Sequence, residues 1–217
     1  MLPTRPEPMA TTLVLPPAYC GGIGRYVLMM RHERTVVDTS RQYDKRFKSP
    51  HRCVIADTRG PLQLTVPIAK PERHHGTRWA DIRISLHGRW WDVHRTAMAS
   101  AYGRTPFYEF ISDRFEALWR SFSSEQCNLS LMDLDAAIEA EICRLLGIEA
   151  PVYTDDPGDL RATARPYDEN AATVAPYWQV RQGELGFIPG MSILDLIFNL
   201  GPEAPLALAE AKHPLVV

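Results

Sequence analysis

One stretch of the sequence concentrates side chains with catalytic potential, residues 81–110, DIRISLHGRWWDVHRTAMASAYGRTPFYEF. It contains two of the five tryptophans and two of the seven histidines. His94 follows Trp90 by four residues, so both side chains fall on one largely apolar helix face. A histidine in that position is either a core residue with a satisfied hydrogen bond, or a general acid/base or hydrogen-bond donor to a bound phosphate or sugar. We therefore expect this stretch to line any chemical site, with His94 as the catalytic candidate.

The elements around His94 would position further polar groups. Alternation predicts a strand at Asp81–Ser85, which places Asp81, Arg83 and Ser85 on one face. Gly88 then opens a helix that ends at Gly103. Trp91 and Tyr102 share a stripe of this helix, next to the stripe that carries His94.

Histidines and cysteines elsewhere do not form a convincing metal site. His74 and His75 are adjacent in a charged loop, without a third ligand nearby. Cys20, Cys53, Cys127 and Cys143 are widely spaced and lack the close pairs typical of structural zinc. We expect buried thiols and no metal, and no motif identifies a cofactor.

Charge is distributed unevenly along the chain, although the net charge is only −2. Residues 41–95 carry 12 Lys and Arg against 5 Asp and Glu, whereas residues 124–217 carry 5 against 15. The basic block indicates an anionic small-molecule ligand, unless the two blocks simply face each other and solvent. Nucleic acid is not expected, because the basic residues form no continuous run. No apolar run is long enough to span a membrane, and the N-terminus lacks a signal-peptide pattern.

The chain opens with a strand–turn–helix–strand pattern, which indicates an α/β fold with a parallel strand pair. The strands are predicted at Thr11–Leu15 and Thr35–Thr39, and the helix at Ile23–Arg31. The turn, Tyr19-Cys20-Gly21-Gly22-Ile23-Gly24, can be purely structural or can present N–H groups to a phosphate. It matches neither G-x-G-x-x-G nor a P-loop.

Further elements predict a mixed sheet flanked by helices, with a helical second half. A hairpin is expected at His51–Ala56 and Leu62–Ile68, and helices at Pro106–Phe122, Leu131–Leu146 and Ser192–Asn199. A short strand is expected at Tyr177–Val180. The predicted organisation is a tail (1–10), an α/β core with a helical hairpin (11–149), an irregular loop or lid (150–176), a strand and helix packed on the core (177–209), and a tail (210–217).

Several segments, taken in order, resemble the WbqC-like protein family. They are P-x-Y at Pro17–Tyr19, R-C-x-I at Arg52–Ile55, L-T-V-P at Leu64–Pro67, then D-I-R-I-S, W-x-x-x-H-R-T, S-A-Y and P-F-Y, and finally S-I-L-D-L-I-F-N-x-G-P-E. The resemblance spans nearly the whole chain. It implies a cytoplasmic bacterial protein of surface-polysaccharide (O-antigen type) biosynthesis, acting on a nucleotide-linked sugar or its modification.

The chain departs from the family pattern near its N-terminus. Many members carry H-Q-P-x-Y-x-P-W, and the aligned residues 15–22 here read LPPAYCGG, so only Pro17 and Tyr19 match. If the family histidine is catalytic, its absence shifts that role to His94.

Three hypotheses follow. In the first, the protein is a transferase on a sugar nucleotide. His94 would act as the acid/base, with Asp81 and Asp195 orienting hydroxyls or a basic partner. Tyr19 and Tyr102 would line the pocket, and phosphate would be held by Lys45, Arg46, Arg52 and Arg83. Ser85, Trp91 and Asn199 complete the expected substrate site.

In the second hypothesis, the protein is a non-catalytic binding or scaffold protein of a glycan-assembly complex. In the third, it is a nucleotide- or aminoacyl-type transfer enzyme.

Overall fold

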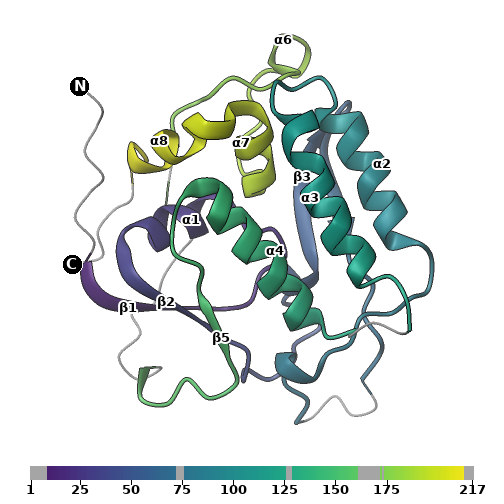
Figure 1. The fold of residues 1–217 in the computed structure, drawn as a ribbon, viewed down its shortest axis with the longest axis vertical. Helices are drawn as coiled ribbons and strands as arrows, with labels where there is room; N and C mark the ends of the chain where they lie inside the picture. Colours follow the sequence, from purple (N-terminus) through teal and green to yellow (C-terminus); the bar gives the residue numbers. More distant parts are fainter. Residues whose placement is uncertain (1–8, 72–75, 126–128, 161–171, 173, 213–217) are drawn as a thin grey trace.

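A computed structural model describes residues 9–71, 76–125, 129–160, 172 and 174–212. The predicted α/β class is confirmed (Figure 1). Its parallel and antiparallel strands belong to two separate sheets, in the described part of the chain.

The first sheet contains three parallel strands in the order β1-β2-β5: β1 (Met9–Leu15), β2 (His32–Asp38) and β5 (Val152–Thr154). The helix α1 (Ile23–Met30) connects β1 to β2. It is buried from Gly24 to Met30, as its almost entirely apolar sequence requires. The opening strand–turn–helix–strand unit therefore folds as the sequence predicts.

The second sheet is the predicted hairpin of β3 (Arg52–Asp57) and β4 (Gly60–Thr65). The short helix η1 (Ser49–His51) leads into it. On one side β3 contacts the helix α2 (Trp90–Tyr102). On the other, Val54 accepts a backbone hydrogen bond from Ser192, at 2.8 Å.

Helices surround the two sheets. α2, α3 (Tyr108–Ser121) and α4 (Leu131–Leu146) pack in sequence, each against the next (Figure 1). Ser130 caps α4 by accepting from the Asp133 N–H at 3.2 Å, and Gly147 ends it with φ 64°. The C-terminal α7 (Ile193–Leu200), η4 (Gly201–Glu203) and α8 (Ala204–Ala209) follow, and both α7 and α8 contact α1.

The strand predicted at Asp81–Ser85 is wrong. Asp81 ends the short helix η2 (Trp79–Asp81), and two isolated bridges follow, Arg83 with Ser130 and Ile84 with Ile68. The segment lies between two neighbours. Ile84 N–H donates to Leu129 O and Ile82 O accepts from Leu131, while on the other side Ser85 N–H donates to Pro67 O and Arg83 O accepts from Ala69. Each side has only a single bridged residue pair, so neither pairing extends into a ladder.

The strand predicted at Tyr177–Val180 is also absent, since the structure assigns no strand to these residues. Side chains take the place of a neighbouring strand: Val180 N–H donates to Asn199 Oδ1 at 3.0 Å, and Gln179 N–H donates to Gln182 Oε1 at 3.4 Å. The chain continues into the one-turn helix α6 (Gln182–Leu185).

Three boundaries also differ from the prediction. The segment 150–176 contains β5, because Val152–Thr154 completes the parallel sheet. Met9 and Ala10 belong to β1 rather than to a tail. Ala211 is buried, and its carbonyl oxygen accepts a hydrogen bond from Arg31, so the packed chain continues past residue 209.

Candidate functional site

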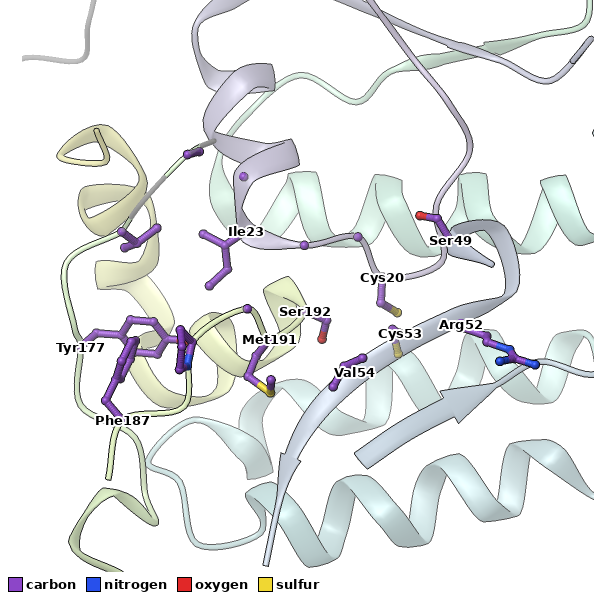
Figure 2. Close-up of a pocket in the computed structure, with 17 residues that line it drawn as sticks. Cys20, Ile23, Ser49, Arg52, Cys53, Val54, Tyr177, Phe187, Met191 and Ser192 are labelled. Carbon is purple, nitrogen blue, oxygen red and sulfur yellow. The ribbon is translucent and has the colours of Figure 1, made fainter. Parts of the chain in front are cut away.

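A pocket of about 540 Å³ lies beside the Gly-rich turn. Three segments distant in sequence form it: the turn with the start of α1, the start of the β3 hairpin, and the segment leading into α7 (Figure 2). Its lining includes Cys20, Gly21, Gly22, Ile23, Gly24, Ser49, Arg52, Cys53, Val54, Tyr177, Phe187, Pro189, Gly190, Met191 and Ser192. A pocket of this size and mostly apolar lining is suited to a small organic ligand.

Two backbone hydrogen bonds hold these segments together. The Ile193 N–H donates to Gly21 O at 2.9 Å, and the Ser192 N–H donates to Val54 O at 2.8 Å. The N-terminal residue of α7 is thus attached directly to the turn that begins α1. As a result, the N-terminal ends of both helices lie at the same pocket.

The turn itself is tightly constrained. Cys20 has φ 45°, a left-handed conformation unusual for a residue with a side chain. A Cβ added to Gly21 would lie 2.6 Å from Arg25 Cδ, so only glycine fits there without movement, whereas Gly22 has open space. The close approach of Arg25 therefore explains one glycine of the Gly-rich turn.

A buried ion pair supports the turn from behind. Arg25 donates to Glu139 from Nε at 2.5 Å and from Nη2 at 2.9 Å, and from Nη1 to Pro16 O at 2.7 Å. Tyr153 Oη donates to the second Glu139 oxygen at 2.8 Å. The two charged side chains are 0% and 1% exposed. This network fixes α1 against α4 and holds the turn in place.

The electrostatics of the pocket favour an anion. Among its described lining residues there is no Asp or Glu, and Arg52 is the one cationic side chain. The positive ends of the α1 and α7 dipoles add to this potential. Burial raises the pKa of the Cys20 thiol well above its usual value, so the thiol is neutral near pH 7. In its described lining the pocket thus has donors and positive potential, but no carboxylate that could act as a base.

His94 lies in the core, and it is not among the residues that line this pocket. Its Nδ1 is 2.9 Å from Tyr19 Oη and its Nε2 is 3.2 Å from Thr65 O. Because the carbonyl can only accept, Nε2 carries the proton and Tyr19 donates to Nδ1. The rings of Trp90 and Trp119 enclose it, and burial lowers the pKa of His94 to about 4. Its geometry is that of a neutral, fully bonded core histidine, and its acid/base role stays a prediction.

Asp81 is exposed and lies apart from this enclosed histidine. Its carboxylate accepts from Arg78, whose guanidinium also contacts Asp155, and these hydrogen bonds lower the pKa of Asp81. The structure does not bring Asp81 and His94 into one catalytic pair.

The predicted phosphate-binding residues also separate, and only Arg52 lines the pocket. Arg46 is exposed and pairs with Asp44, and Lys45 and Arg83 are also exposed. Ser85 and Trp91 are partly buried outside the pocket.

Asp195 and Asn199 form a buried network that reaches the pocket wall indirectly. Asp195 accepts hydrogen bonds from Tyr177 Oη and, at 2.7 Å, from Gln179 Nε2. Asn199 accepts from the Val180 N–H at 3.0 Å. Burial raises the pKa of Asp195. These contacts attach the segment that carries Tyr177 to α7.

Tyr102 is also buried, and its Oη accepts from the Ala56 N–H at 3.1 Å. The expected ligand contacts of these residues remain untested predictions.

Sequence reasoning missed the α7 side of the pocket. Ser192 was expected only as the first residue of a helix; it lies at the N-cap of α7, and its side chain accepts no capping hydrogen bond. Phe187 and Met191 carried no signal, because single apolar residues in loops are common. A usable signal was the similarity between Gly190-Met191-Ser192 and the Gly-rich start of α1, since both precede an apolar helix.

The expectations for the histidine pair and the cysteines can be followed only in part. His74, His75 and Cys127 lie outside the described residues. Cys20, Cys53 and Cys143 are buried free thiols, as expected. In the described residues no cluster of potential metal ligands occurs, and none of the helices has the length and apolarity needed to cross a membrane.

Comparison with known proteins identifies one relationship. The model of the WbqC-like protein family matches residues 17–164. The match includes the Gly-rich turn and β3, and it ends before the α7 side of the pocket. Curated proteins and solved structures gave no match.

Proposed function

The chain belongs to the WbqC-like protein family, and we propose that it serves surface-polysaccharide biosynthesis of the O-antigen type. The family name points to this biosynthetic context. Within it, we propose that the protein is a cytoplasmic bacterial transferase that binds a nucleotide-linked sugar, or a precursor of its modification, in the pocket beside the Gly-rich turn.

The observation that carries this proposal is the pocket itself. Two helix N-termini and Arg52 border a cavity that has no carboxylate among its described lining residues, and mostly apolar residues form its walls. Such a site favours a ligand with a negatively charged part and a larger, less polar part. A nucleotide-linked sugar has both, since its phosphates are anionic and its base is flat and weakly polar.

The lack of an acid/base group in the pocket favours a second candidate. No His, Asp or Glu lines the described pocket, and both nitrogens of His94 are engaged in the core. A protein with this site could bind an activated sugar and present it to a partner enzyme. Under this candidate the same ligand binds but is not converted.

A panel of sugar nucleotides tests both candidates. Thermal unfolding is measured with each compound, and a ligand present at 100 times its Kd adds about 2.7 kcal/mol of apparent stability. Compounds that raise Tm are then incubated with the protein and analysed for conversion. Conversion supports the transferase, and binding without conversion supports the binding protein. If no compound raises Tm and none is converted, the proposal is wrong.

A further inference from the structure

We infer that the pocket binds a nucleoside diphosphate group in one orientation, with phosphoryl oxygens between Ser192 and Arg52 and the ring system against Tyr177 and Phe187. This deepens the proposed function and rests on it for the ligand class. The family match covers Arg52 but ends before Tyr177, Phe187 and Ser192, and it assigns no role to any residue.

Ser192 supplies the first independent evidence. The residue is 3% exposed, and its buried Oγ has no hydrogen-bond partner in the described structure. A buried hydroxyl without a partner is unfavourable, and such a group needs an explanation. Ser192 lies at the N-terminus of α7 and lines the pocket, among the labelled side chains of Figure 2. An anion bound at this helix end would give the hydroxyl an acceptor.

Arg52 supplies the second. Its Nε is buried without a partner, and its one recorded side-chain hydrogen bond is a long contact of 3.5 Å to Gln63. In the described part of the chain it forms no ion pair, whereas Arg25 and Arg78, for example, bind carboxylates. Arg52 thus has an unused donor, and no carboxylate lies among the described residues that line the pocket. Such an arginine is suited to phosphate, which accepts two parallel hydrogen bonds.

The aromatic residues define the opposite end of the pocket. Tyr177 and Phe187 contact each other edge to face with ring centroids 5.3 Å apart. Figure 2 shows them at one end of the pocket, with Arg52 and Ser49 at the other and Ser192 between. A planar ring can pack against aromatic side chains. The order of groups therefore matches a molecule with a ring at one end and phosphates at the other.

Isothermal titration calorimetry with three probes tests this orientation: inorganic pyrophosphate, uridine 5′-diphosphate and uridine. Ser192→Ala should weaken pyrophosphate and the diphosphate alike by about fivefold, and Arg52→Met by about tenfold. Phe187→Ala should weaken the diphosphate by about fivefold and leave pyrophosphate unchanged. Uridine should bind far more weakly than the diphosphate.

Two controls separate these effects from misfolding. Arg59→Met removes an exposed arginine of the same hairpin and should not change binding. Ser192→Ala removes a hydroxyl that has no partner in the free protein, so its Tm should not fall.

The orientation is overturned if wild-type protein does not bind pyrophosphate at millimolar concentration. It is also overturned if Ser192→Ala and Arg52→Met bind it as wild type does, or if Phe187→Ala weakens pyrophosphate as much as the diphosphate. The proposed function fails separately. If pyrophosphate binds as described and no sugar nucleotide binds, the phosphate subsite is supported and the proposed function is wrong. If sugar nucleotides bind equally well to wild type and to all variants, the proposed function is supported and the orientation is wrong.

Discussion

Replacing Glu139 by leucine should be one of the most damaging single changes behind the site. Arg25 and Glu139 are joined by two hydrogen bonds and are almost completely buried. Removing one member of such a pair leaves an uncompensated charge, which costs about 3–5 kcal/mol. Arginine cannot lose its proton to escape this cost, and Tyr153 Oη would lose its acceptor as well. For a protein of this size, the loss corresponds to a Tm lower by about 6–20 °C.

The double variant Arg25→Met/Glu139→Leu makes the prediction sharper. It contains neither charge, so it should be more stable than Glu139→Leu alone, even though it differs more from wild type. Urea unfolding at pH 7 measures all variants. Asp44→Asn serves as control, because its partner Arg46 is 86% exposed and an ion pair exposed to solvent contributes little to stability. If Glu139→Leu costs no more than this control, or if the double variant is the least stable, the reasoning is refuted.

Two further predictions follow from the turn and the core. Lowering the pH from 7 to 4.5 should destabilise the protein by about 2–3 kcal/mol through His94 alone. Its pKa is about 4 when folded and 6.5 when unfolded, so the unfolded chain binds more protons in this window. His51, whose burial also lowers its pKa to about 4, acts in the same direction. His94→Gln should reduce the pH dependence of the free energy of unfolding. An unchanged dependence would contradict the lowered pKa of His94. Gly21→Ala should cost about 1–3 kcal/mol because its Cβ meets Arg25. Gly22→Ala meets open space and loses only the preference for glycine at the N-cap of α1, so it should cost less, about 0.5–1 kcal/mol; a Tm for Gly22→Ala as low as that for Gly21→Ala would contradict the packing.

The sequence predicted most of the regular elements because their signals are local. The apolar runs at β1 and α1, the 3.6-residue periodicity of α2, α3 and α4, and Gly147 after α4 all act within a few residues. The errors have the opposite cause. Whether Asp81–Ser85 forms a ladder depends on Leu129 and Pro67, and three-residue β5 becomes a strand only because β2 offers it an edge.

The candidate site was harder to predict than the fold. The Gly-rich turn and Arg52 were identified, because glycine and positive charge are visible in sequence. Ser192 and Phe187 were not, since their importance depends on α7 approaching the turn through the Ile193–Gly21 hydrogen bond. His94 shows the converse, because periodicity placed it correctly beside Trp90, yet periodicity could not show that both ring nitrogens find partners.

The most direct test of the account is a crystal structure of the protein with a bound uridine diphosphate sugar. The diphosphate should lie at the N-termini of α1 and α7, within hydrogen-bond distance of Ser192, and the ring system beside Tyr177 and Phe187. A ligand bound elsewhere on the protein, with this pocket left empty, would contradict it.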